Sequence, residues 1–211
     1  SALSIGLDHM SLYQLTIEPG TGFFTRSRAG ETLVASDDLA ADLYGMTADI
    51  MESAGLPAYE VSNHARAGQE SRHNLVYWRA QDWIGGGPGA HGRITDGHAR
   101  IGTATRRGPQ GWLEDVRTKG HGIETEIRDH GDDVLAEHLM MGLRLTEGVD
   151  LVTIAQRIGH SDPFTGRNPL LDRDIVERLV ALCLLEWLGN SRLAVTSKGR
   201  LVLNSIIAEL L

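Results

Sequence analysis

The chain has 211 residues, of which 41% are hydrophobic and 23% charged, a composition typical of ordinary globular domains. Its formal net charge of −8 argues against the broad phosphate-binding surface of nucleic-acid-binding proteins. No apolar run approaches the ~20 residues needed to cross a bilayer, and no secretory leader is recognisable. We therefore expect a cytoplasmic protein with one large domain or two small ones.

Cys183 is the one cysteine of the sequence. A lone cysteine excludes an internal disulfide framework and fits a reducing compartment. The chain cannot hold an iron–sulfur cluster by itself, because such a cluster normally takes three or four thiolates. Since leucines stand at 182, 184 and 185, we expect Cys183 to be a small buried hydrophobe.

The first 62 residues predict a strand, a helix and a second strand. Residues 10–17 are largely apolar on both alternating faces, which is typical of a strand covered on both sides. Ser36 is a good N-cap for the helix that follows. One face of that helix carries an apolar stripe: Leu39, Leu43, Met46 and Ile50. Residues 58–62 predict the second strand, so we expect a parallel βαβ unit.

Residues 63–111 are rich in glycine, histidine and arginine, and we expect loops with short strands there, including a hairpin near Asp96 and Gly97. Beyond about residue 112 the pattern becomes mostly helical. Residues 150–211 predict a helix capped by Asp150, a longer helix over 172–185, a short strand and a last helix. That order resembles a winged-helix arrangement.

His73 opens the segment with the strongest chemical signal. A neutral imidazole is a good axial ligand for haem iron. Tyr77 and Trp78 could pack against a porphyrin face, and Asn74 could orient the imidazole or bond a propionate. The spacing alone favours a plainer interpretation, a histidine hydrogen-bonded within a loop.

Two other segments have backbone or polar groups suited to a ligand. The run from Gly85 to Gly92 permits close backbone approach, and its N–H groups could face a phosphate or carboxylate. A turn at a strand end is the alternative for that run. Tyr13, Gln14 and Glu18 stand where a barrel strand would end, which is where ligands of barrel proteins lie. The spacing of the other histidines predicts no metal site.

Five segments together resemble a known family: residues 11–21, 59–65, 73–78, 87–91 and 196–204. They are similar to the C-terminal half of the radical S-adenosylmethionine (radical SAM) proteins that include oxygen-independent coproporphyrinogen III oxidase and a haem chaperone. The resemblance covers nearly the whole chain. Its His-Asn-x-x-Tyr element is typical of the chaperone branch.

The resemblance implies an α/β fold followed by a mostly α domain. Residues 1–111 would be the C-terminal part of a radical-SAM partial TIM-type barrel and would carry the haem-binding loop. Residues 112–211 would form the helical C-terminal domain, winged-helix-like at 150–211. Because half a barrel leaves an open strand edge, we expect poor solubility or self-association. A strand so close to the first residue also suggests a fragment.

The resemblance also implies the site residues. His73 would ligate haem with Asn74 and Tyr77 beside it, and Tyr13 and Gln14 would line the S-adenosylmethionine site. The 4Fe-4S cluster and its cysteine motif would belong to the full-length parent, upstream of this chain. Whether the parent is an enzyme stays open, and we expect this chain to be inactive alone.

The implied function is haem binding and transfer to acceptor haemoproteins, respiratory ones among them, with peripheral membrane contact as a further expectation. The alternative is an oxygen-independent coproporphyrinogen III oxidase (coproporphyrinogen dehydrogenase) of porphyrin biosynthesis. A winged-helix DNA binder is a third hypothesis. The helix expected at 172–185 carries three acidic residues near its start against two arginines, so we predict no nucleic-acid partner.

Overall fold

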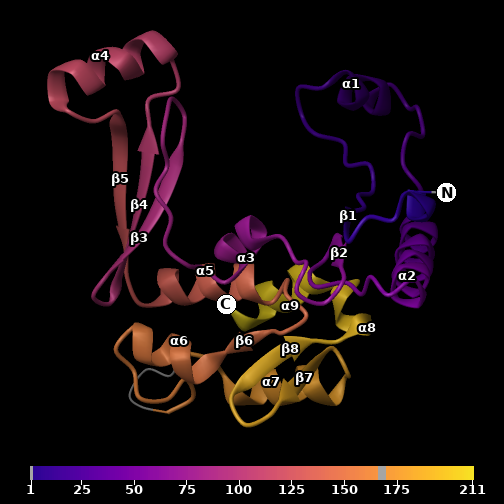
Figure 1. The fold of residues 1–211 in the computed structure, drawn as a ribbon. Coiled ribbons are helices and arrows are strands. Elements are labelled where there is room, and N and C mark those ends of the chain that lie inside the picture. Colours follow the sequence, from indigo (N-terminus) through magenta and orange to yellow (C-terminus); the bar gives the residue numbers. More distant parts are fainter. Residues whose placement is uncertain (1, 166–169) are drawn as a thin grey trace. The chain divides into compact units, whose positions relative to one another are not determined.

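The computed structural model describes residues 2–165 and 170–211. The chain divides into two compact units, Ser1–Ser71 and Arg72–Leu211. Each unit contains both helices and strands (Figure 1), so the predicted mixed α/β composition is confirmed. Within the described ranges, no helix has the length and apolar character needed to span a membrane.

The first unit is built around one long helix. Its elements are η1 (Ala2–Ile5), β1 (His9–Ser11), α1 (Gly22–Arg28), α2 (Asp37–Ser53) and β2 (Asn63–Ala65). The predicted cap of α2 is confirmed, because the Ser36 hydroxyl accepts a hydrogen bond from the Leu39 backbone N–H at 3.4 Å. Gly55 follows the helix end at φ +75°, where an L side chain would be strained.

The two strands of the first unit pair antiparallel, so the predicted parallel βαβ unit is wrong. Residues 58–65 form a hairpin in which Ala58 is bridged to His64. β2 is the second strand of this hairpin, and it is the strand that pairs with β1. Because the hairpin reverses the chain before β2, β2 runs antiparallel to β1. The Ser11 hydroxyl donates a hydrogen bond to the Asn63 side chain, which fixes this register.

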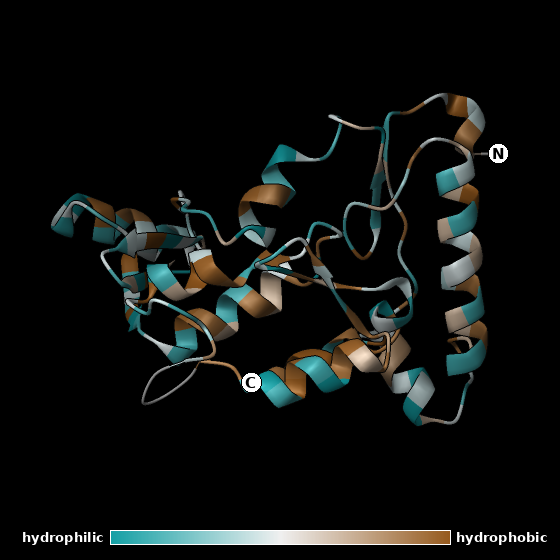
Figure 2. Cartoon of the chain, turned by 90° about the horizontal axis from the view of Figure 1, so that it is seen from below, coloured by the Kyte–Doolittle hydropathy of each residue, from teal (hydrophilic) through white to brown (hydrophobic). Residues whose placement is uncertain are grey.

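The predicted strand over 10–17 is also shorter than expected, because β1 ends at Ser11. Tyr13 is 75% exposed and Leu15 is 51% exposed, so this segment is not covered on both sides. The apolar stripe of α2 does follow one helix face, and Figure 2 shows its apolar residues separated by polar ones. All four stripe residues are nevertheless exposed: Leu39, Leu43, Met46 and Ile50. Met51 is the α2 side chain that is fully buried.

The second unit begins with a short helix and a three-stranded antiparallel sheet. Its elements are α3 (Arg72–Trp78), β3 (His91–Asp96), β4 (Ala99–Thr105), α4 (Pro109–Lys119) and β5 (Ile123–Asp129), with sheet order β3-β4-β5. The predicted hairpin is confirmed, because Asp96 pairs with Ala99 across a two-residue turn with Gly97 at φ +61°. Helix α4 lies at one end of this sheet, and the chain continues into α5 at the other (Figure 1).

The remainder of the second unit contains most of the hydrophobic core. Its elements are α5 (Asp132–Gly142), β6 (Val149–Asp150), α6 (Leu151–Arg157), α7 (Arg173–Ala181), β7 (Leu185–Leu188), β8 (Arg192–Val195), α8 (Ser197–Arg200) and α9 (Leu203–Leu210). The strands form an antiparallel sheet of order β6-β8-β7. Asp150 caps α6, as predicted, and Asp172, the first residue of the helix expected over 172–185, caps α7. Four apolar side chains on one face of α9 are buried, as helical periodicity predicts: Leu203, Ile206, Ile207 and Leu210.

The prediction that Cys183 is buried is wrong, and the helix expected to reach residue 185 ends at Ala181. Cys183 lies at φ +57°, its N–H bonds to the Val180 carbonyl, and the next N–H bonds to the Leu179 carbonyl. This is a Schellman helix end, in which the left-handed residue turns outward and is usually glycine. The turn geometry therefore exposes the thiol, although leucines surround it in sequence.

Candidate functional site

The three predicted haem-binding residues lie on α3, so the loop expected there is a helix. The helix ends in the same type of motif as α7. Ala80, at φ +47°, donates its N–H to the Tyr77 carbonyl, and Gln81 donates to the Val76 carbonyl. Ala80 is 1% exposed, so the end of α3 is anchored in the core of the second unit.

His73 and Tyr77 stand four residues apart and therefore share one face of α3. Their ring centroids are 4.8 Å apart and their planes meet at 65°. Tyr77 in turn meets Trp83 edge-on at 4.6 Å. His73 is exposed and Tyr77 half-buried. The ring nitrogens of His73 make no hydrogen bond within the described residues. Asn74, the next residue along the helix, is half-buried.

Trp83 is held from both sides. Its backbone exchanges two hydrogen bonds with Arg93, at 2.8 and 2.9 Å, which ties it to the β3–β4 hairpin. The Arg100 guanidinium lies 5.6 Å from the Trp83 ring centroid, within the range of a cation–π contact. The aromatic series His73–Tyr77–Trp83 therefore connects an exposed imidazole to the interior of the second unit.

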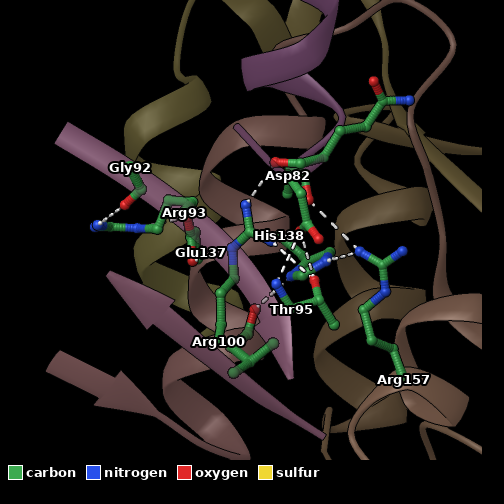
Figure 3. Close-up of polar contacts among 11 residues, drawn as sticks. Asp82, Gly92, Arg93, Thr95, Arg100, Glu137, His138 and Arg157 are labelled. Atoms are coloured by element: carbon green, nitrogen blue, oxygen red, sulfur yellow. Dashed lines mark hydrogen bonds and ion pairs between the residues drawn. The ribbon is translucent and has the colours of Figure 1, made fainter. Parts of the chain in front are cut away.

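Arg100 also belongs to an ion-pair network, which Figure 3 shows. Arg100 is 1% exposed, and its Nε lies 2.8 Å from Oε2 of Glu137. The other carboxylate oxygen of Glu137, Oε1, lies 3.3 Å from Arg93 Nε. Asp82 lies 3.4 Å from Arg100 and accepts hydrogen bonds from Thr95. Burial acts to raise the pKa of Asp82, but the Thr95 hydrogen bonds and the Arg100 charge outweigh it and lower that pKa.

His138 joins this network from α5. Its Nδ1 lies 2.7 Å from the Val134 carbonyl, and its Nε2 lies 3.0 Å from an Arg157 Nη1 donor (Figure 3). These partners assign the neutral tautomer with the proton on Nδ1. Burial lowers the pKa of His138, and the Arg157 charge adds to the effect against the opposing Val134 hydrogen bond.

The predicted glycine run forms the entry to β3. A Cβ on Gly85 would stand 2.3 Å from the His91 carbonyl oxygen, and a Cβ on Gly92 would stand 2.7 Å from the Thr103 hydroxyl. The Thr105 hydroxyl donates to the Gly87 carbonyl at 2.6 Å. The glycines at 85 and 92 thus serve close backbone packing against the hairpin.

Tyr13 and Gln14, the residues predicted on the S-adenosylmethionine side, lie in the first unit. Tyr13 is mostly exposed, and the Gln14 side-chain amide donates to the Ala40 carbonyl at 2.7 Å. Both residues line a largely apolar cavity of about 620 Å³ formed by residues 13–17 and 33–43. In this structure they lie beyond the end of β1 rather than on a strand.

Sequence reasoning missed the Arg100–Glu137 network, because its members are spread over residues 82–137 without a local pattern. It also missed His138. In residues 2–165 and 170–211 no group of three or more His, Cys, Asp or Glu side chains could hold a metal ion.

Comparison with known proteins gives one consistent family. The HemN C-terminal domain profile matches residues 129–161. "Heme chaperone HemW" of Bacillus subtilis is 32% identical over 100% of this chain and 53% of its own length. "Radical S-adenosyl methionine domain-containing protein 1, mitochondrial" of Mus musculus is 37% identical over 97% of this chain and 46% of its own length.

The chain is a homologue of HemW. It spans about half the length of the HemW proteins that it matches. The solved structure of coproporphyrinogen III oxidase (HemN) from Escherichia coli, described as a radical SAM enzyme, has the same fold over 99% of this chain and 49% of that one, with a TM-score of 0.65. Sequence identity to HemN is 17%, so the match to the HemN structure concerns the fold alone.

Proposed function

We propose that the protein is a haem chaperone that binds haem through His73 and transfers it to acceptor haemoproteins. The observation that carries the proposal is the exposed imidazole of His73, supported by Tyr77 and Trp83 on the edge of the second unit. A neutral imidazole is a common axial ligand of haem iron. The name of the HemW relatives supports the same function.

The residues present fit haem as a cargo. His73 has no hydrogen bond to described residues that would occupy a ring nitrogen, so a lone pair is available for iron. Tyr77 restrains the imidazole by its edge-on contact and presents an aromatic surface beside it. Asn74 is the third residue that we propose for the site, as a group that orients the imidazole or bonds a propionate.

For the full-length parent we propose S-adenosylmethionine and a 4Fe-4S cluster, as in radical SAM proteins. Tyr13 and Gln14 are proposed on the S-adenosylmethionine side, supported by the cavity that both line. The cluster does not fit the residues of this chain, whose one cysteine cannot supply three thiolates.

We also propose the finer divisions of the fold: a barrel portion over 1–111, a helical domain over 112–211, and a winged-helix-like part over 150–211. The order β6, α6, α7, β7, β8 with an antiparallel sheet supports the last of these. A cytoplasmic location, respiratory acceptors, peripheral membrane contact and self-association stay predictions.

A haem titration followed by absorbance tests the proposal. We expect stoichiometric binding with a shifted Soret band, lost in His73→Ala. His130→Ala is the matched control, because His130 is also exposed and lies at the end of β5. Equal binding by wild type and His73→Ala would remove His73 from the site, and no binding by wild type would refute haem binding by this chain.

The alternative activity, oxygen-independent coproporphyrinogen III oxidation, has the shared fold with HemN in its favour. Product analysis of the full-length protein with S-adenosylmethionine and coproporphyrinogen III separates the two functions. Decarboxylated product would establish the oxidase, and its absence together with haem binding would support the chaperone.

A further inference from the structure

A second cavity lies wholly within the second unit, on another side of α3 from His73. It has a volume of about 410 Å³, and its wall comes from α3, α5, β6, α6 and the start of β8. This volume lies within the range of small-molecule sites, about 300–1,000 Å³. Trp78 stands five residues after His73, so the two side chains leave the helix in different directions. The cavity is therefore separate from the proposed haem ligand.

The charges in the cavity wall are not balanced. Three arginines line it, Arg79, Arg157 and Arg192, against two carboxylates, Glu147 and Asp150. Glu147 is bound by Arg79 through two hydrogen bonds of 2.8 and 2.9 Å. Asp150 is engaged as the cap of α6. The hydrogen bonds of both carboxylates thus go to other groups. The Arg79 hydrogen bonds and, to a lesser degree, the charge of Arg192 lower the pKa of Glu147, so this carboxylate also interacts with Arg192.

Arg157 and Arg192 have no carboxylate within ion-pair distance in the part of the chain that the structure describes. Arg157 uses Nη1, which donates to His138 at 3.0 Å and points to the Ala80 carbonyl at 3.5 Å. Arg192 also uses Nη1, which donates to the Glu147 and Gly148 carbonyls at 3.2 Å each. A guanidinium group has five N–H donors, so most donors of both half-buried groups are left for a ligand.

Trp78 lines the cavity, but its indole nitrogen is enclosed by the protein and does not face the cavity. Trp78 Nε1 is buried and has no hydrogen-bond partner within the described residues. An indole N–H can only donate, and a buried donor without an acceptor is unfavourable. His138 cannot supply the acceptor, because its Nε2 already accepts from Arg157. The cavity therefore offers guanidinium donors and a wall of net positive charge, in a chain whose formal net charge is −8.

We propose that this cavity binds a small oxyanion, a carboxylate or a phosphate, between Arg157 and Arg192 and beside Trp78. Such a ligand carries acceptors and negative charge, which would balance the third arginine of the wall. Guanidinium groups pair well with both anions because their parallel N–H donors match two oxygens. The proposal does not depend on haem binding.

The test is a titration of the full chain with inorganic phosphate and, separately, with succinate. Trp78 gives the local signal: its indole N–H resonance in ¹⁵N–¹H correlation spectra, assigned among four tryptophans as the one missing in Trp78→Phe. We expect a saturable shift of this resonance with at least one anion. A response to phosphate alone, to succinate alone or to both would identify which oxyanion class binds.

Arg192→Gln is the main variant, because the hydrogen bonds of Arg192 go to backbone carbonyl groups and it forms no close ion pair with a described residue. Its loss should leave the fold intact, as far-UV circular dichroism would verify. We expect binding weakened by about tenfold or more in this variant. Arg117→Gln removes the same charge from an exposed helix position and should bind like wild type. No saturable shift with either anion, or equal affinity in Arg192→Gln and Arg117→Gln, would overturn the proposal.

Discussion

Glu137→Gln should destabilise the second unit more than any exposed ion-pair variant. The Glu137 side chain is 17% exposed and pairs with Arg100, which is 1% exposed, and with Arg93. Removing one partner of a buried pair typically costs ~3–5 kcal/mol, because the other charge is left uncompensated. Arg100 keeps the Gln81 carbonyl at 3.0 Å and the half-exposed Asp82. We therefore expect a loss of about 2–3 kcal/mol in the free energy of unfolding.

Urea unfolding followed by far-UV circular dichroism measures this loss, and thermal unfolding should show a drop of ~5–10 °C for a unit of this size. Asp96→Asn is the matched control, because the Asp96–Arg128 pair has a similar distance, 2.8 Å, but side chains that are 59% and 45% exposed. Exposed pairs contribute about 0–1 kcal/mol. Equal losses in the two variants would refute the reasoning that burial of Arg100 makes this network stabilising.

Three other substitutions or conditions test the backbone and the buried histidine. Cys183→Gly should raise the free energy of unfolding by about 0.5–1 kcal/mol, because glycine adopts a positive φ without strain. Urea unfolding in reducing buffer measures this change. A destabilised variant would contradict the left-handed helix end at Cys183. Gly85→Ala should lower stability by about 1–3 kcal/mol because of the 2.3 Å approach to the His91 carbonyl oxygen, whereas Gly86→Ala, with open space, should change little. Stability should also fall as the pH drops below about 6.5, because the depressed pKa of His138 in the folded state lets the unfolded chain bind its proton first. This contribution is complete above the unfolded pKa and disappears as the pH falls towards the folded value; an identical pH profile in His138→Gln would exclude His138 as its source.

The features predicted correctly from sequence are those set by neighbouring residues. The caps at Ser36 and Asp150 were predictable because a side-chain oxygen satisfies backbone N–H groups two or three residues away. The hairpin at Gly97 follows in the same way from turn geometry. The apolar face of α9 follows from helical periodicity.

The features missed depend on residues far apart or on the path of the chain. Arg100 and Glu137 are separated by 37 positions, and no local spacing brings them together. The parallel pairing failed because the hairpin over 58–65 reverses the chain before it meets β1. Cys183 was misplaced because its exposure is set by a left-handed turn that hydropathy does not encode. Of the candidate site, His73 and Tyr77 were found as a pair, but Trp83 behind them was not.

The aromatic series from His73 to Trp83 has an optical consequence. Trp83 lies one ring beyond Tyr77, which itself touches the imidazole proposed to ligate haem. A porphyrin bound there would absorb across the emission band of that indole and quench it by energy transfer. If haem binds at His73 as proposed, Trp83 would therefore report its loading and release by fluorescence without an attached dye.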